Sequence, residues 1–448
     1  MKPRLLVTTD IGADPDDEQS LIRLLVHAND MDLEGIVPDL WEKHEGRLGA
    51  LTPQTQMELV HEIIRRYGRV GDNLACHANG FPAEDALHSM VKRGPVHVPN
   101  PAKQGAPVDV SHLVGDGKDT EGSDWIIACA DRGDSFNRPL DISIWGGSAS
   151  LAQALFRVRQ TRSAAAVDTF VKRLRVHAIG DQDDTGPWIR REFPRLFYIL
   201  NHGMDDDKLS ACFRGMYMGG DESTTSREWV RANVSRRHGP LGAFFPEETW
   251  TAPNPHGCLK EGDTPAWFYF LDNGLHVPSE PGAGGWGGRY EWSDQYGCYR
   301  DARDTVDADT SHRATVYRWR SRFQNEFAAR MDWCIAPPLQ ANHKPEAVCN
   351  GERGTEVLRV AARPGDRITL DASGSRDPDG DGLTFAWWVY GEAGTYRGEP
   401  LIEGAASPDA VVVVPDDARG KTFHVILEVT DTGNPPLTSY RRIIIAAE

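Results

Sequence analysis

Short apolar runs and amphipathic stretches alternate along the first three quarters of the chain. The apolar runs have the length and composition of buried strands and lie at residues 4–9, 33–37, 142–145, 174–179 and 196–200. Stretches with apolar residues at helical spacing lie between them, at residues 15–27, 53–67 and 150–157. This alternation predicts an α/β domain with a mostly parallel sheet flanked by helices.

The pattern changes in the last quarter of the chain. An arginine- and aromatic-rich helix, YRWRSRFQNEFAARMDWCI, is predicted to close the first region, and a proline-bearing connector follows it. Short β-type runs separated by turn residues come next, among them LTFAWWVY, AVVVVP and TFHVILEVTD. Such runs are typical of a small immunoglobulin-like β-sandwich. We therefore expect two domains, at residues 1–337 and 338–448.

The net charge of the chain limits the kinds of partner that it can bind. The chain has 448 residues and a formal net charge of −17, which disfavours binding to nucleic acids and to anionic membranes. A neutral small molecule or oligosaccharide is compatible with this charge. No apolar run is long enough to span a bilayer, and MKPRLLV lacks the apolar core of a signal peptide, so the cytoplasm is the default expectation. The sequence predicts no oligomeric state.

The seven cysteines are scattered and form no C-x-x-C pair, which argues against structural zinc and against a dense disulfide framework. The odd number leaves at least one thiol outside any intrachain bridge.

Acidic residues crowd the segment TTDIGADPDDEQSL, directly after the first predicted strand. A local interpretation makes Asp14 a helix N-cap and Pro15 the first helical residue, with Asp16 and Asp17 at the positive end of the helix dipole. It explains neither Asp10, which lies earlier at the strand end, nor the crowding of like charges. A hard cation bound through several oxygens would explain both. Ca²⁺ fits, and Mg²⁺ is an alternative that demands tighter octahedral geometry.

Polar segments also follow other predicted strands. They are PDLWEKHE, GGSAS, DQDDTGPW and NHGMDDD. Ligands of open parallel sheets bind beyond the carboxyl ends of the strands, where these segments should meet. Each segment alone could be a solvated loop, but together they predict an acidic pocket.

The acidic segment resembles the D-x-D-P-G-x-D-D motif of the nucleoside hydrolases in an enlarged form. Nearly the whole chain resembles a nucleoside hydrolase-like family of cellulose-binding proteins, through DQDDTGPWIRREFP, HGPLGAFFP, EGDTPAWFYFLDNGL, GGWGGRYEW and FQNEFAARMDW. Members of that family pair such a domain with an immunoglobulin-like C-terminal domain. The resemblance suggests a periplasmic or secreted location if a signal peptide has been removed.

The resemblance implies a Ca²⁺ cofactor and a general base. Asp10 matches the aspartate that binds calcium and activates water, and Asp17 matches a second metal ligand. Asp263 is the candidate for the late calcium aspartate, and the backbone carbonyl of Ala149 is the candidate for a further ligand. Thr8 replaces the first aspartate of the motif.

The resemblance also implies contacts to a sugar. Asp14 and Asp16 compete for binding of sugar hydroxyls, because two residues are inserted in the motif. The other candidates for substrate contacts are Trp41, Asp183, Asp184, Glu261, Trp286 and Tyr290. The alternatives are a solvated loop for the acidic pair at 183–184 and a flexible glycine-rich loop for the aromatic residues at 286–290.

One departure from the nucleoside hydrolases concerns the leaving group. Those enzymes carry a histidine directly before the late calcium aspartate, where this chain has Gly262. This argues against purine and pyrimidine nucleosides as substrates. We therefore expect calcium-dependent hydrolysis of an N- or O-glycosidic bond at a furanose-like sugar, with Asp10 as base. The rival hypothesis is a glycan-binding protein that keeps the hydrolase fold without turnover.

The turn SRDPDGDGLTFAWW in the second domain resembles turns of polycystic-kidney-type and cadherin-like sandwiches. Asp377, Asp379 and Asp381 have the spacing of the start of an EF-hand loop, but Trp388 occupies the position of the required bidentate glutamate. We expect a tight β-turn here, with a weak structural Ca²⁺ site as the alternative.

Overall fold

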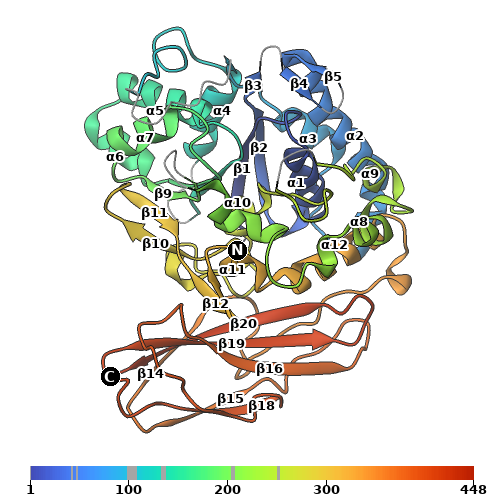
Figure 1. Cartoon of the computed structure of the whole chain (residues 1–448), viewed down its shortest axis with the longest axis vertical. Helices are drawn as coiled ribbons and strands as arrows, with labels where there is room; N and C mark the ends of the chain where they lie inside the picture. Colours follow the sequence, from blue (N-terminus) through green and yellow to red (C-terminus); the bar gives the residue numbers. More distant parts are fainter. Residues whose placement is uncertain are drawn as a thin grey trace.

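The computed structural model describes residues 2–41, 44–46, 49–97, 108–132, 138–202, 207–249 and 253–448. Its centre is a seven-stranded sheet that is parallel except for one antiparallel pair at its edge, β10 with β11 (Figure 1). In spatial order the strands are β10 (Tyr290–Ser293), β11 (Cys298–Asp301), β9 (Phe197–Leu200), β8 (Leu174–Ala178), β7 (Leu140–Ile144), β1 (Arg4–Thr9) and β2 (Asp32–Pro38). The predicted fold class is confirmed.

Helices cover both faces of the sheet because its central strands are apolar on both sides. Leu5 and Val7 of β1 pack into one core cluster, with α1 (Pro15–Val26), α2 (Pro53–His77), α10 (Thr264–Phe268) and α12 (Arg320–Trp333). Leu6 and Ile142 pack into the other, with α4 (Glu121–Ala130), α5 (Ala149–Thr161), α6 (Ala164–Val171) and α7 (Thr185–Glu192).

Short elements connect these parts. They are η1 (Ala28–Asp30), β3 (Leu40–Trp41), β4 (His44–Gly46), β5 (Gly49–Leu51), α3 (Glu84–Met90), β6 (Val96–His97), η2 (Lys208–Ser210), η3 (Cys212–Met216), η4 (Ser223–Thr225), α8 (Arg227–Val230), η5 (Arg231–Ser235), α9 (Gly239–Gly242), η6 (Pro281–Ala283), β12 (Asp304–Val306), β13 (Asp309–Ser311), α11 (Ala314–Tyr317) and η7 (Pro338–Gln340).

The C-terminal region is a two-sheet sandwich. One sheet has the order β14 (Leu358–Ala362), β20 (Thr438–Ala447), β19 (Thr422–Asp431) and β16 (Leu383–Tyr390). The other has the order β15 (Arg367–Asp371), β18 (Asp409–Val413) and β17 (Ile402–Glu403). Apolar side chains from both sheets form a separate core. The boundary at residues 337/338 stays a prediction, and it falls between α12 and β14.

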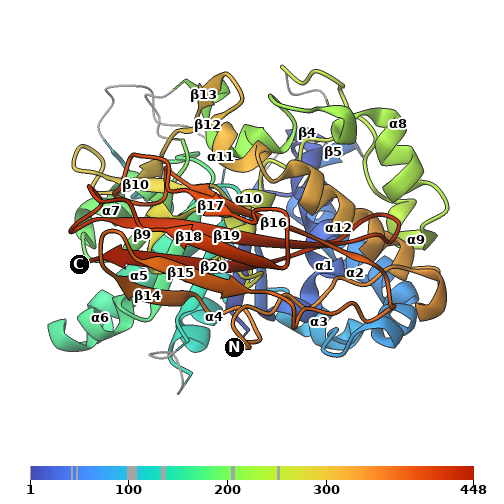
Figure 2. The same cartoon turned by 90° about the horizontal axis from the view of Figure 1, so that it is seen from below.

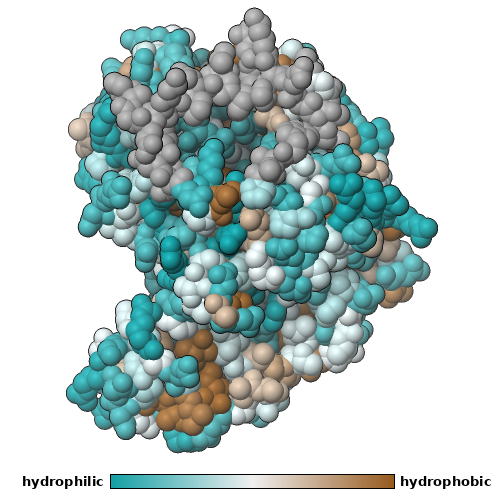
Figure 3. Space-filling view, viewed as in Figure 1, coloured by the Kyte–Doolittle hydropathy of each residue, from teal (hydrophilic) through white to brown (hydrophobic). Residues whose placement is uncertain are grey.

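The sandwich packs against the α/β domain over a broad face (Figures 1 and 2). Tyr440 of β20 accepts a hydrogen bond from the Trp286 indole at 3.2 Å, and both side chains are buried. Tyr390 of β16 donates to Asp304, a carboxylate that also pairs with Arg289. The surface in Figure 3 is mainly hydrophilic over the α/β domain, and its largest apolar patch lies on the sandwich.

The structure also describes the cysteines and the apolar character of the helices. All seven cysteines are free thiols, and six of them are buried. Among the described residues, no helix combines the length and the apolar character needed to cross a membrane.

Candidate functional site

A pocket opens at the carboxyl ends of the central strands, where parallel sheets bind ligands. Its volume is about 310 Å³, at the lower end of the usual range for small-molecule sites. Acidic residues supply five of its lining side chains, and basic and aromatic residues supply most of the others. The lining residues are Asp10, Ala13, Asp14, Asp16, Asp17, Trp145, Ile179, Gly180, Gln182, His202, Lys208, Phe213, Arg214, Lys260 and Asp263.

Three carboxylates converge on one side of the pocket. Asp16 and Asp17, in the first turn of α1, meet Asp263, which directly precedes α10, and one oxygen from each lies within 4.8 Å of the other two. Burial raises the pKa of all three, most strongly for Asp17 and Asp263, and repulsion from neighbouring aspartates raises it further. The helix start is therefore placed so that its acidic residues face the strand ends.

Asp10 lies beside this group, at the end of β1. Burial and the charge of Asp16 raise its pKa to about 7, and its charge in turn raises the pKa of Asp17 and of Asp263. A Cβ added at Gly146 would lie 2.7 Å from the Asp10 carboxyl carbon. Because Gly146 has no side chain, the Asp10 carboxylate can occupy this space.

Asp14 does not act as the helix cap that local preferences suggest. It stands at the N-cap position of α1, but its side chain makes no capping hydrogen bond. It instead pairs with Lys260, whose ammonium also lies 3.0 Å from Asp16 Oδ2. These two carboxylates raise the pKa of Lys260, so the lysine stays charged and offsets part of the acidic charge.

The residues present fit a calcium ion. The donors are all carboxylate oxygens, as a hard cation requires, and their spacing allows one ion to contact three of them. Asp263 Oδ2 is buried and has no hydrogen-bond partner in the described part of the chain. An oxygen in that position is costly unless a proton or a cation satisfies it. Asp16 thus joins Asp17 and Asp263 as a candidate ligand, with Asp10 alongside.

The position of the missing histidine, Gly262, is crowded by neighbouring side chains. A Cβ at Gly262 would lie 2.9 Å from Asp16 Oδ2 and 3.3 Å from the Phe213 ring. A larger side chain would displace one of these neighbours. A histidine at this position would therefore require Asp16 to move.

Glu261 does not reach the pocket, contrary to its predicted role. Its carboxylate forms a two-point ion pair with Arg23, with both N–O distances 2.6 Å, and both side chains are fully buried. Because both oxygens are engaged by the guanidinium, the predicted sugar contact is replaced by a structural role.

The predicted stacking residues Trp286 and Tyr290 are also buried, at 0% and 1% exposure. Trp286 packs edge-on against Phe268 and lies at the contact with the sandwich. The Tyr290 hydroxyl donates to the Gly287 carbonyl at 2.5 Å. Neither ring is exposed in this structure, so the predicted stacking on sugars is not supported by their placement.

The acidic pair after β8 is engaged locally. Asp183 Oδ1 accepts hydrogen bonds from the Thr185 amide and hydroxyl, and Asp184 Oδ2 accepts one from the Asp109 amide. Neither residue lines the pocket; the residue of that segment that does is Gln182. The predicted sugar contacts of this pair are therefore not supported by their placement.

Two further candidates stay predictions. Ala149 is fully buried at the first position of α5 and is not among the residues that line the pocket. Trp41 pairs with His97 in a short parallel ladder, and its side chain lies outside the described part of the structure.

Sequence reasoning missed several lining residues. Lys260 comes directly before the EGDTP segment, and this closeness in the sequence is the signal that could have identified it. Lys208, Phe213 and Arg214 come from the loop after β9, where only the distant packing of the chain decides which side chains face the pocket.

Comparison with known proteins gives the same assignment over most of the chain. Residues 4–290 match the family described as cellulose-binding Sde182, nucleoside hydrolase-like domain. Residues 367–447 match the C-terminal domain of cellulose-binding protein Sde0182. No curated protein matches the sequence.

One solved structure covers the whole chain. It is a nucleoside hydrolase-related hypothetical protein from Saccharophagus degradans that is associated with carbohydrate metabolism, and it is 35% identical, with a TM-score of 0.81 and 100% of both chains covered. The solution structure of the PKD domain from KIAA 1837 protein is 24% identical over 20% of this chain and 81% of that domain. Its TM-score of 0.16 carries no argument about fold.

Proposed function

This chain belongs to the Sde182 family of cellulose-binding proteins with a nucleoside hydrolase-like domain, and we propose that its acidic pocket hydrolyses a glycosidic bond at a furanose-like sugar with calcium as cofactor. The observation that carries the proposal is the convergence of four buried carboxylates at the strand ends. They are Asp10, Asp16, Asp17 and Asp263. Like charges held together in this way are unfavourable unless protons or a cation neutralise them.

The four carboxylates have different roles in this proposal. Asp16, Asp17 and Asp263 would hold Ca²⁺, which supplies a positive charge that orients water and sugar hydroxyls. Asp10 accepts a proton from the attacking water, because it lies at the strand end beside these ligands. Asp14 and Lys260 form an ion pair that also lines the pocket, and these two side chains bind sugar hydroxyls.

Water attack without a covalent intermediate would invert the anomeric carbon. The walls of the pocket help by excluding bulk water, since Trp145, Phe213 and Ile179 supply apolar surface next to the acidic groups. Charges act more strongly in such surroundings.

The size and chemistry of the pocket limit the substrate. A volume of about 310 Å³ accommodates a small sugar with a modest leaving group. A side chain at Gly262, where nucleoside hydrolases carry a histidine, would require the Asp16 carboxylate to move. We therefore expect furanosides with good leaving groups to be better substrates than purine nucleosides.

A second candidate is glycan binding without turnover. Lys260 already pairs with Asp14 and Asp16 and offsets part of their charge, and the family description names cellulose binding. In that case the pocket would recognise sugar hydroxyls through its charged groups and perform no chemistry.

One experiment separates the two candidates. The wild-type chain is assayed with nitrophenyl furanosides and nucleosides in the presence of Ca²⁺, and the best substrate is then given to Asp10→Asn. Loss of a general base lowers the rate by about 10²–10⁴-fold. Asp116→Asn, which changes an exposed carboxylate outside the pocket, serves as the control and should retain wild-type activity.

Equal rates in wild type and Asp10→Asn would show that the mechanism is wrong. If wild type cleaves none of these compounds but binds cello-oligosaccharides, and Asp14→Asn weakens that binding, the glycan-binding candidate is correct.

A further inference from the structure

We propose that the C-terminal sandwich has a Ca²⁺ site of its own, formed by Asp377, Asp379 and Asp381 of the β15–β16 loop together with Asp431 at the end of β19. The site lies where the sandwich meets the connector from the α/β domain. It is separate from the acidic pocket and does not depend on the proposed hydrolysis.

The loop carboxylates already have the spacing of metal ligands. One oxygen from each of Asp377, Asp379 and Asp381 lies within 4.8 Å of the other two. The same loop lies next to Asp431, because Leu383 at the start of β16 is the direct partner of Asp431 in the antiparallel ladder. The Gly382 amide also donates to the Thr432 hydroxyl at 3.1 Å.

Asp431 supplies an observation independent of the cluster. Its side chain is 3% exposed, and its Oδ1 accepts hydrogen bonds from Asn342 Nδ2 and from the amides of Gly433 and Leu437 at 2.9–3.0 Å. Its Oδ2 is buried and has no hydrogen-bond partner among the residues that the structure describes. A buried carboxylate oxygen without a partner is unfavourable.

Asp377 shows the same arrangement on the loop side. Its Oδ1 accepts hydrogen bonds from the amides of Asp379 and Asp381 at 2.8 Å and 3.0 Å, while its Oδ2 is buried without a partner in the described structure. Burial raises the pKa of Asp431, and the nearby charge of Asp377 raises it further. Asp377 and Asp431 thus lie close enough for their charges to interact, and each has a buried carboxylate oxygen without a partner among the described residues.

The donor set identifies the cation. All four residues offer carboxylate oxygens, and an irregular loop supplies three of them. The Asp379 carboxylate also lies 3.0 Å from the His343 Nδ1 atom. Ca²⁺ accepts such flexible, oxygen-rich surroundings, whereas Mg²⁺ demands strict octahedral geometry. Trp388 excludes an EF-hand, because it occupies the position of the bidentate glutamate. In the proposed site, Asp431 of β19 supplies the fourth carboxylate instead.

The site would fix the connector between the domains. Asn342 joins Asp431 on one side, and its carbonyl accepts a hydrogen bond from Trp333 of α12 at 2.9 Å on the other. The next residue, His343, contacts Asp379 and lies 2.9 Å from His77 of α2. Calcium bound between these aspartates would therefore stabilise the docking of the sandwich as well as the loop.

The test counts calcium ions on the full chain. Protein freed of metal by chelation is titrated with Ca²⁺ alone, and bound calcium is measured by calorimetry and by elemental analysis. Asp431→Asn and Asp377→Asn keep the amide oxygen that accepts the existing hydrogen bonds but remove the charge. Each is expected to lose one bound ion per chain and most of the calcium-dependent rise in melting temperature that this site provides.

Two controls define the result. Asp371→Asn changes a carboxylate in the same sandwich that accepts the amide two residues ahead, as Asp377 does, and it should bind as much calcium as wild type. Asp263→Asn removes a ligand from the acidic pocket and should leave the sandwich ion in place.

The proposal is overturned if Asp431→Asn and Asp377→Asn both bind as much calcium as wild type. It is also overturned if Asp263→Asn abolishes all calcium binding. If Asp431→Asn does not fold, Asp377→Asn on the more exposed loop decides the question alone.

Discussion

At the residue scale, the role of a buried acidic side chain depends on whether a cation is paired with it. Glu261 faces Arg23 and is neutralised completely, whereas Asp263, two residues later, has a buried oxygen without a partner among the described residues. The sequence KEGDTP cannot reveal this difference, because Arg23 lies 238 residues away. Such long-range pairing explains why a motif could place Asp263 at the pocket while it could not reveal the ion pair of Glu261.

Replacing Glu261 with Gln should destabilise the protein without a direct effect on substrate binding. The change leaves the Arg23 guanidinium buried without its counter-charge, and breaking a buried pair in this way lowers the free energy of unfolding by about 3 kcal/mol or more. Urea unfolding followed by tryptophan fluorescence measures the loss.

Glu403→Gln is the matched control for that variant. Glu403 forms a similar two-point pair with Arg367, but about half of each side chain is exposed. Exposed pairs contribute about 1 kcal/mol or less, so this variant should stay close to wild type. Equal stability of Glu261→Gln and wild type would contradict the structural role and return Glu261 to the list of substrate contacts.

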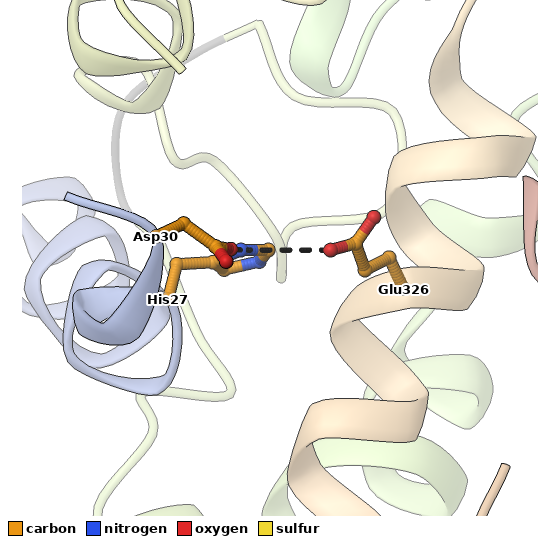
Figure 4. Close-up of side chains that lie close together, drawn as sticks. All are labelled: His27, Asp30 and Glu326. Atoms are coloured by element: carbon orange, nitrogen blue, oxygen red, sulfur yellow. Dashed lines mark hydrogen bonds and ion pairs between the residues drawn. The ribbon is translucent and has the colours of Figure 1, made fainter. Parts of the chain in front are cut away.

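At the element scale, the junction of α1, η1 and α12 contains a third group of potential metal ligands. Figure 4 shows His27 and Asp30 facing Glu326 of α12, with His27 Nδ1 at 3.4 Å from Asp30 and 3.9 Å from Glu326. Arg330 pairs with both carboxylates, and Lys344 of the connector lies 3.5 Å from Glu326. These two cations already neutralise the group, so we interpret it as an ion-pair network that joins the elements.

This junction should make the protein sensitive to mild acid. Burial, with the charge of Arg330, lowers the pKa of His27 from 6.5 to about 4. Between these values the unfolded chain binds a proton that the folded chain does not, so the free energy of unfolding falls as the pH falls, by about 1.4 kcal/mol per pH unit. Chemical unfolding of wild type and His27→Gln from pH 7 to pH 4 compares the two slopes.

The variant should show the shallower decline, because it lacks that titrating group. His112→Gln, at an exposed position, should follow wild type. Other buried groups titrate equally in all three proteins, so their contributions cancel in the difference. A wild-type slope in His27→Gln would show that His27 is protonated in the folded state or accessible to water.

Element prediction succeeded where the local pattern was long and regular. The helix predicted at 53–67 begins as expected, with Thr52 capping Thr55, but continues to His77 because Val70 and Leu74 extend its apolar face. The hairpin of β10 and β11 was not predicted, since its glycine-rich approach suggests a loop. Tertiary packing instead makes this hairpin the edge of the central sheet, where the side chain of Tyr290 in β10 is buried.

At the scale of the whole molecule, the two predicted domains meet in a buried contact, although the sandwich also has a core of its own. Trp319 packs edge-on against both Tyr390 and Tyr440 of the sandwich, and Arg442 donates hydrogen bonds to the carbonyls of Leu275 and Gly284. The change of pattern near residue 337 indicates that a second domain exists, but periodicity contains no information about which faces meet. For that reason Trp286 was expected in the sugar site and lies at the domain contact.

A chain that ends at Ala336 tests the importance of this contact. Without the sandwich, Trp286 and Trp319 lose the tyrosines that cover them and become exposed to water, which costs about 25 cal/mol per Å² of apolar surface. We expect the full chain to unfold in one calorimetric transition and the shortened chain to melt at a lower temperature. Because all candidate ligands of the acidic pocket precede residue 336, the shortened chain should still bind calcium there and not at the sandwich site. Two separate transitions in the full chain, or an unchanged melting temperature after truncation, would show that the domains are stable independently and that the buried contact between them is energetically minor.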